Sequence, residues 1–150
     1  LHLSIRRQRQ MCIRDRYNYV NRPWRTQELV DSVYKSQYAN SVDGLSGNED
    51  CGQMSAWYIL NSMGFYQVCP GKPVYSIGRP AFDKAVINLP GEKTFSIVVK
   101  NNAKTHKYIE SVLLNGKPLD TPFFNHQDIT AGGVMEIKMT DRPTKWGVSK

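Results

Sequence analysis

Two adjacent carboxylates, Glu49 and Asp50, are the side chains best suited to acid–base chemistry or metal binding. They follow a glycine-rich stretch and open an apolar run that predicts a helix over residues 48–63. Asn48 is a typical N-cap, and Gly64 is typical just beyond a helix C-terminus. In the first helical turn, free N–H groups and the helix dipole favour a charged carboxylate, which a general base or metal ligand requires. Acidic residues in first turns also act as simple caps, so both interpretations remain open.

The elements around this motif predict an α+β fold. Apolar residues recur at helical spacing over residues 23–38, which predicts a helix before the one at 48–63. A proline- and glycine-rich boundary follows at residues 70–73. Beyond it the period is two, and turn residues separate five expected strands, which we assign to an antiparallel sheet or small sandwich: Val74–Ile77, Ala85–Leu89, Phe95–Val99, Ile109–Leu114 and Val134–Met139.

A basic segment, residues 1–16, carries five arginines and one aspartate, which is +4 of the formal net charge of +7. It lacks helical or strand periodicity. Its stretch Met11-Cys12-Ile13-Arg14-Asp15-Arg16 resembles a translated sequencing adapter, so we expect residues 1–16 to be non-native and outside the fold. A nucleic-acid partner would depend on this segment alone, so none is expected. No stretch reaches the ~18 apolar residues of a membrane span.

One run of the sequence resembles a signature near the C-terminal end of glycoside hydrolase family 92: Gly47-Asn48-Glu49-Asp50-Cys51-Gly52-Gln53-Met54-Ser55-Ala56-Trp57-Tyr58. Members of that family are calcium-dependent, exo-acting, inverting α-mannosidases. The resemblance covers about residues 17–147, and these further segments occur in the family's order: Tyr17-Asn18-Tyr19, Pro23-Trp24-Arg25-Thr26-Gln27, Gly64-Phe65-Tyr66, Tyr75-Ser76-Ile77-Gly78, Asn115-Gly116-Lys117-Pro118-Leu119 and Trp146-Gly147. The resemblance implies a C-terminal fragment of such an enzyme.

The resemblance also implies an architecture and a location. Residues 17–70 are expected to hold the last helices of an (α/α)6 barrel, and residues 71–150 the C-terminal β region of the same catalytic unit. The implied enzyme hydrolyses terminal α-linked mannose from glycans in the periplasm, at the cell surface or outside a bacterial cell. The alternative is a non-catalytic, carbohydrate-associated β-domain with a helical connector. An open pocket at Asp50 favours the enzyme, and a sealed sheet–helix interface favours the alternative.

The resemblance assigns Asp50 as the general base and Glu49 as a supporting carboxylate. An inverting glycosidase needs this base to activate water and a separate acid to protonate the leaving oxygen. Asn48 stands where many members carry a second aspartate and others carry asparagine. Asn48, Gln53 and Trp24 are expected substrate contacts. The family's acid and much of its calcium site lie upstream of the matched residues. We therefore expect this chain to be inactive without its N-terminal part, and no calcium ligand is assigned within it.

Overall fold

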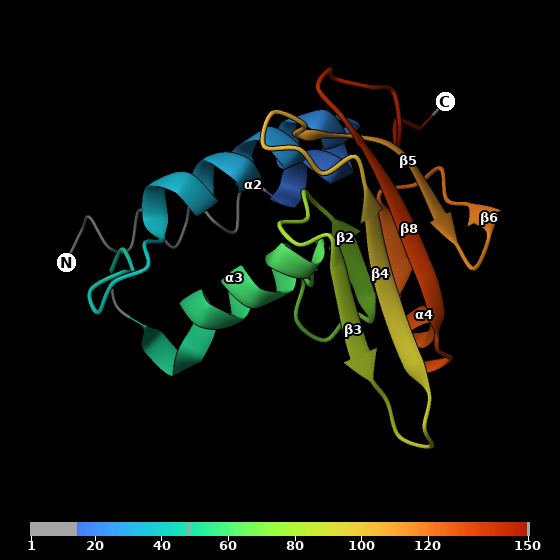
Figure 1. The fold of residues 1–150 in the computed structure, drawn as a ribbon, viewed down its shortest axis with the longest axis horizontal. Helices are drawn as coiled ribbons and strands as arrows, with labels where there is room; N and C mark the ends of the chain where they lie inside the picture. The colour runs from blue at the N-terminus through green and yellow to red at the C-terminus, as the bar shows by residue number, and fades with distance from the viewer. Residues whose placement is uncertain (1–14, 48, 150) are drawn as a thin grey trace.

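The structure, a computed structural model, describes residues 15–47 and 49–149 and places a pair of helices beside two β-sheets (Figure 1). The helical elements are η1 (Asp15–Val20), α2 (Pro23–Gln37), η2 (Asp50–Gly52), α3 (Gln53–Met63) and α4 (His126–Thr130). The strands are β1 (Phe65–Tyr66), β2 (Val74–Ile77), β3 (Lys84–Asn88), β4 (Thr94–Lys100), β5 (Tyr108–Leu114), β6 (Lys117–Pro118), β7 (Phe123–Asn125) and β8 (Gly133–Thr140). The α+β class is confirmed. Across the described ranges, no helix combines the length and apolarity needed to cross a bilayer.

The described strands form two sheets, with the orders β3-β4-β8-β5-β6 and β1-β2-β7. The five expected strands are present as β2, β3, β4, β5 and β8, each within one residue of its expected bounds. The short strands β1, β6 and β7 and the helix α4 are additions to the expected pattern. They are too short to display a recognisable period.

The expectation of a purely antiparallel sheet is wrong for the central pair β4 and β8. These strands run parallel, with Phe95 opposite Gly133 and Lys100 opposite Lys138. The other strand pairs in the described part of the chain are antiparallel. Residues 101–132 form the long crossover that a parallel pair requires. A period of two locates a strand but carries no information about its direction, so the alternation could not reveal this pairing.

The core of the β region lies on one face of the larger sheet. Alternate side chains of its central strands are buried there: Phe95, Ile97 and Val99 from β4, and Met135, Ile137 and Met139 from β8. Phe65, Ile77 and Phe124 of the smaller sheet belong to the same cluster. The alternation follows from strand geometry, in which successive side chains point to opposite faces.

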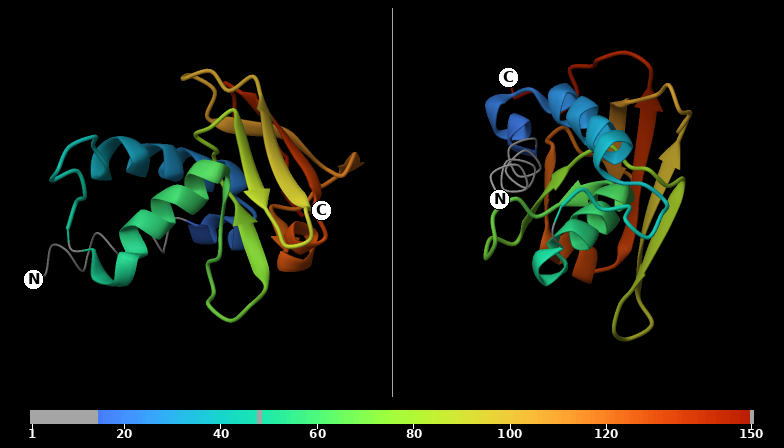
Figure 2. Two further views of the ribbon diagram at one scale, coloured as in Figure 1. Left: turned by 60° about the horizontal axis from the view of Figure 1, so that its bottom comes forward. Right: turned by 90° about the vertical axis from the view of Figure 1, so that its left-hand side faces the viewer.

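The helices α2 and α3 project side by side from the sheets and run in opposite directions (Figures 1 and 2). α2 begins beside the sheets, where the Gln27 Oε1 atom accepts the Ile109 N–H of β5 at 3.0 Å. Its bounds agree with the expected helix to within one residue, and Pro23 suits its first turn. The chain turns at the end remote from the sheets, and α3 returns toward them. A small core joins the two helices, formed by Val30, Val33, Met54 and Trp57.

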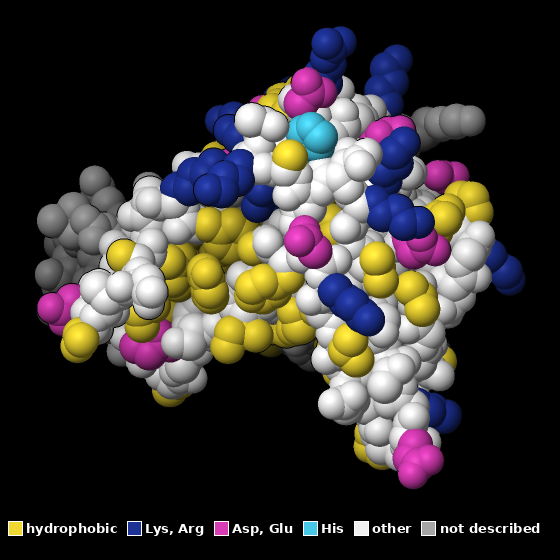
Figure 3. Space-filling model, viewed as in Figure 1, with side chains coloured by type: hydrophobic (Ala, Val, Ile, Leu, Met, Phe, Trp, Pro, Cys, Tyr) yellow, Lys and Arg dark blue, Asp and Glu magenta, His cyan; other side chains and the backbone are white. Residues whose placement is uncertain are grey.

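The helical pair leaves several apolar side chains in solvent. Figure 3 shows such side chains gathered between and over the two helices. On α3, Ile59 is 56% exposed and Tyr58 is 37% exposed, whereas Met54 and Trp57 are each 1% exposed. α3 is therefore apolar on an inward face and on an outward face, as is typical of a helix covered on both sides.

Candidate active site

The backbone around Asp50 forms a strained turn that leads into α3. Within η2, Cys51 has φ 54° and ψ 27°, and Gly52 follows with φ 72°. Left-handed backbone suits glycine, but at Cys51 it costs ~1–2 kcal/mol. Such strain is concentrated at functional sites. It also explains why the expected helix start at Asn48 is wrong: left-handed residues cannot continue an α-helix, so α3 begins at Gln53 with Gly52 at the N-cap.

Glu49 caps α3 from outside the helix. Its two carboxylate oxygens lie 3.1 and 3.2 Å from the backbone nitrogen of Ser55 and accept its N–H. Ser55 is the third residue of α3, where a backbone N–H has no partner within the helix. The expected first-turn position of Glu49 and Asp50 is wrong, because no acidic residue lies in the first turn of α3. The Glu49 charge nevertheless faces a helix N-terminus, where the dipole favours it.

Tyr38, the residue after α2, holds the start of α3 from the other helix. Its hydroxyl donates to the Met54 carbonyl oxygen at 2.8 Å. Its ring stacks on Trp57, with centroids 5.9 Å apart and planes 4° from parallel. Burial, followed by the nearby Glu49 carboxylate, raises the pKa of Tyr38 well above its usual value, so the hydroxyl keeps its proton. The sequence does not reveal this contact, because Tyr38 counts there only as the last apolar residue of the expected helix 23–38.

A hollow of about 540 Å³ lies between the ends of the two helices and the loop that joins them. Its lining includes Tyr34, Tyr38, Ser55, Tyr58 and residues of the loop 39–45. Tyrosines offer apolar ring faces together with hydroxyl groups, a combination suited to ligands of mixed polarity. Ser55 connects the hollow with the Asp50 turn, because Glu49 caps the Ser55 N–H.

The structure places the expected site residues in two separate regions. Glu49 and Gln53 flank the Asp50 turn, and both are exposed. The half-buried Trp24 is the second residue of α2, at the end beside the sheets. A helix rises ~1.5 Å per residue, which separates Trp24 from the far end of α2, next to the turn, by ~20 Å. Asn48 and the Asp50 side chain lie outside the description, so where they point remains a prediction.

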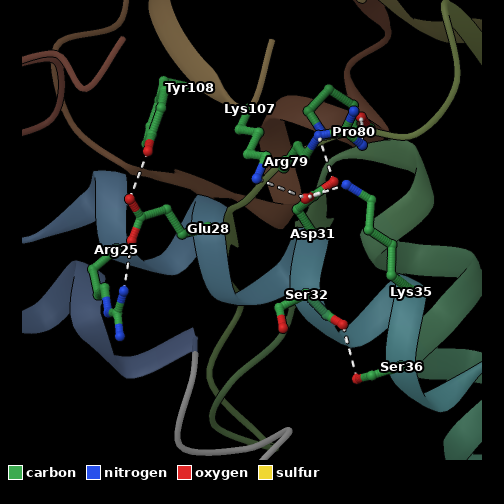
Figure 4. A network of polar contacts seen from close by, with 10 residues as sticks. All are labelled: Arg25, Glu28, Asp31, Ser32, Lys35, Ser36, Arg79, Pro80, Lys107 and Tyr108. Carbon is green, nitrogen blue, oxygen red and sulfur yellow. Dashed lines mark hydrogen bonds and ion pairs between the residues drawn. The ribbon is translucent and has the colours of Figure 1, made fainter. Parts of the chain in front are cut away.

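A charged network fixes α2 to the β region (Figure 4). The buried Asp31 carboxylate pairs with Lys35 of the same helix at 2.7 Å. It also pairs with Arg79, after β2, at 3.4 Å and with Lys107, before β5, at 3.6 Å. Opposite charges offset the desolvation of a buried carboxylate. The network therefore sets how the helical pair, and the turn at its far end, is oriented relative to the sheets.

Glu28, one turn before Asp31, makes a second link in this network. Its carboxylate accepts hydrogen bonds from the Tyr108 hydroxyl at 2.6 Å and from Arg25 at 2.7 Å. The bond to Glu28, together with burial, raises the pKa of Tyr108 to about 12. Burial alone raises the pKa of Glu28, but the bonds from Tyr108 and Arg25 outweigh it and the net shift is downward. These shifts follow from a structural contact between helix and strand.

The described residues do not by themselves fit a calcium site. They contain no cluster of three or more His, Cys, Asp or Glu side chains able to hold a metal ion. Ca²⁺ takes about six to eight oxygen ligands. Both oxygens of Glu49 are engaged by the Ser55 N–H.

Known proteins are similar to this chain in sequence and in fold. The sequence model described as the Glycosyl hydrolase family 92 catalytic domain matches residues 6–141. A family 92 α-mannosidase from Bacteroides thetaiotaomicron, solved in complex with mannoimidazole, is 33% identical, with a TM-score of 0.87 over 93% of this chain and 18% of that chain. A family 92 inverting mannosidase from the same organism is 37% identical, with a TM-score of 0.86 over 92% of this chain and 19% of that chain. An uncharacterized secreted glycosidase of Arthroderma benhamiae is 27% identical over 137 residues, 89% of this chain and 18% of that protein.

The chain spans only 18% to 19% of the length of these relatives. The family match begins at residue 6, inside segment 1–16. Residues 1–14 lie outside the described ranges, so the non-native origin of the segment remains a prediction. Because the match covers most of the sequence and the likeness extends to the fold, this chain belongs to glycosyl hydrolase family 92.

Proposed function

We propose that this chain is the C-terminal part of the catalytic unit of an inverting exo-α-mannosidase, which removes terminal α-linked mannose from glycans. Two similar proteins, an α-mannosidase solved with mannoimidazole and an inverting mannosidase, support the substrate class and the stereochemistry. The observation that carries the proposal is the family signature on a strained, exposed turn beside a hollow. Cys51 and Gly52 of that turn are both exposed.

In this proposal, α2 and α3 are the last helices of an (α/α)6 barrel within residues 17–70. Residues 71–150 form the β region of the same catalytic unit. The outward apolar side chain of Ile59 supports this arrangement, since a preceding helix of the barrel would cover it. The N-terminal part of the polypeptide is thus the partner that completes the fold.

Asp50 acts in this proposal as the general base. It accepts a proton from a water molecule while the water oxygen forms a bond to the anomeric carbon. The glycosidic bond breaks at the same time, and an acid elsewhere in the polypeptide protonates the leaving oxygen. The configuration inverts because the water attacks the face opposite the leaving group.

The remaining site residues have supporting roles in the proposal. Glu49 keeps its position as the supporting carboxylate beside Asp50. Gln53 and Asn48 contact the sugar next to the base. Trp24, ~20 Å away along the helix, contacts a more distant part of the glycan or a neighbouring helix of the barrel.

Calcium and location belong to the complete enzyme. We propose that the complete enzyme binds calcium and that the polypeptide upstream would supply most of its oxygen ligands. We also propose a location outside the cytoplasm, in the periplasm, at the cell surface or outside a bacterial cell. The secreted glycosidase to which this chain is similar supports a location outside the cytoplasm.

The alternative function, a carbohydrate-associated β-domain with a helical connector, expects Asp50 in a sheet–helix interface. The neighbours Glu49, Cys51 and Gly52 are exposed, and the turn lies at the end of the helical pair remote from the sheets. This position favours the enzyme.

The test is Asp50→Asn in the complete enzyme. Asparagine keeps the shape and hydrogen bonding of the side chain but cannot accept the proton, so kcat should fall ~10²–10⁴-fold. The melting temperature should change little. A kcat near that of the unaltered enzyme would remove Asp50 from the mechanism. The 150-residue chain by itself should show no turnover of an aryl α-mannoside, because the acid is supplied elsewhere.

A further inference from the structure

Two side chains, Glu49 and Tyr38, form hydrogen bonds with the first turn of α3, which directly follows the Asp50 turn. On one side, the Glu49 carboxylate accepts the Ser55 N–H. On the other, the Tyr38 hydroxyl donates to the Met54 carbonyl oxygen. Met54 and Ser55 are consecutive, so both bonds act on one short piece of helix. The turn itself is held in a left-handed conformation that Cys51 does not favour.

We propose that Glu49 and Tyr38 are positioning residues that hold the Asp50 turn in its strained conformation and so place the base. This inference rests on the proposed role of Asp50. Without the Glu49 cap, the helix could unwind at its first turn and relieve the strain at Cys51. Without the Tyr38 hydroxyl, the start of α3 loses its hydrogen bond to α2. Either change moves the base relative to the water that it activates.

The contacts of the two side chains suit a positioning role for each. Both oxygens of Glu49 lie within 3.2 Å of the same backbone nitrogen. The proton of Tyr38 is committed to a carbonyl oxygen, and its ring is held against Trp57 and against Tyr58, at a centroid distance of 4.7 Å from the latter. Glu49 is needed, in this proposal, as a hydrogen-bond acceptor and not as a charge.

Glu49→Gln and Glu49→Ala in the complete enzyme separate these roles. The glutamine carbonyl oxygen can still accept the Ser55 N–H, whereas alanine cannot. Because a displacement of ~1 Å can cost ~10²-fold, we expect kcat to fall ~10–100-fold in Glu49→Ala and less than ~3-fold in Glu49→Gln, with KM within ~2-fold in both. Both variants lose the same negative charge, so a change in the pH dependence of kcat that both share is due to the lost charge. A difference between the two variants in the maximum kcat is due to the lost hydrogen bond to Ser55.

A second pair of variants tests the other anchor and covers the case in which Glu49→Ala fails to fold. Tyr38→Phe removes the hydroxyl but keeps the stack on Trp57, and we expect kcat to fall about tenfold with KM unchanged. Tyr75→Phe, in strand β2, is the matched control. Its hydroxyl lies 3.0 Å from the His126 Nδ1 atom, within the β region. We expect kcat within ~2-fold of the unaltered enzyme.

The outcomes are distinguishable from a failure of the proposed function. Full activity in Asp50→Asn overturns the role of the base, whatever the other variants show. An inactive Asp50→Asn with equal losses in both Glu49 variants overturns the positioning role and assigns the charge a direct function. Unchanged kcat in Glu49→Ala, or equal effects of Tyr38→Phe and Tyr75→Phe, also overturns the positioning role.

Discussion

The β region and the helical pair of this protein are stabilised in different ways. In the described part of the chain, the β region has a core cluster of thirteen buried side chains, drawn from both sheets, α4 and the C-terminal segment. The helical pair has a cluster of four, surrounded by half-buried tyrosines. The β region buries most of its apolar side chains in its own core. The helices depend in addition on the charged network around Asp31 and leave apolar side chains exposed. The difference shows that the proposed base lies on the less self-sufficient part of the molecule.

The largest effect should come from the sheet core. Phe95 is fully buried and stacks on Phe124, with ring centroids 6.4 Å apart. Phe95→Ala should lower the free energy of unfolding by ~3–5 kcal/mol, measured by urea denaturation. Hydrogen exchange should increase in the helices as well as in the sheets, because the helices depend on the sheets for support.

The matched control is Phe82→Ala, which removes a ring that is 49% exposed. It should cost less than ~1 kcal/mol. Equal losses in the two variants, or faster exchange confined to the helices in Phe95→Ala, would contradict the view that the sheet core supports the whole chain.

The join between the two regions should give the next largest effect. Asp31→Asn leaves Lys35, Arg79 and Lys107 without their shared carboxylate at a buried position. We expect a loss of about 3 kcal/mol in the free energy of unfolding. Glu110→Gln is the control, because its pair with Lys138 is 46% exposed on both sides and should contribute less than ~1 kcal/mol. A small effect of Asp31→Asn would mean that packing alone holds the helices.

The contact between Tyr108 and Glu28 should give a smaller effect with a distinct pH dependence. Tyr108→Phe should cost ~1 kcal/mol near neutral pH, since it removes a partly exposed hydrogen bond to a carboxylate. The pKa of Tyr108 rises from 10.0 to about 12, so its contribution is complete below pH 10 and is lost as the pH rises toward 12. The pKa of Glu28 is lowered, so its contribution is present above its ordinary value of 4.5 and is lost as the pH falls below it.

The free energies of unfolding of the unaltered protein and of Tyr108→Phe, measured by denaturation from acid pH to pH 12, test these two contributions. Between pH 10 and 12 the unaltered protein should lose the stability that this hydrogen bond contributes, and Tyr108→Phe should show no such loss. It should keep part of the acid dependence, because the pair between Arg25 and Glu28 remains. Identical alkaline profiles of the two proteins would assign that dependence to another group.

The smallest effect in this chain should come from the outward face of α3. Ile59→Gln should change the free energy of unfolding of the 150-residue chain by less than ~0.5 kcal/mol, because Ile59 is already exposed. In the complete enzyme, where we propose that another helix covers Ile59, the same change should cost ~2 kcal/mol. Val86→Gln on the edge strand β3 is the control and should have little effect in either protein. Equal small effects of Ile59→Gln in the 150-residue chain and in the complete enzyme would show that no other helix covers this face of α3.

The boundaries of most elements could be predicted because their signals are local. Pro23 and the apolar spacing after it locate α2, and alternation locates the five main strands. The start of α3 could not be predicted in this way. An apolar run is compatible with several starting points, and the left-handed backbone at Cys51 leaves no trace in hydrophobic spacing. Glu49 caps α3 from outside the helix only because of that turn, so the sequence predicted incorrectly that Glu49 lies within the first helical turn.

The sequence by itself determined the α+β class, the position of each main element and membership of the family, because hydrophobic periods and a contiguous signature at residues 47–58 are properties of neighbouring residues. Only the tertiary structure decided that β8 runs parallel to β4, that Tyr38 meets Met54, and that three cations surround Asp31. The parallel pairing and most of these contacts join residues distant along the chain. They depend on how the crossover 101–132 and the returning helix bring those residues together, which local spacing does not specify.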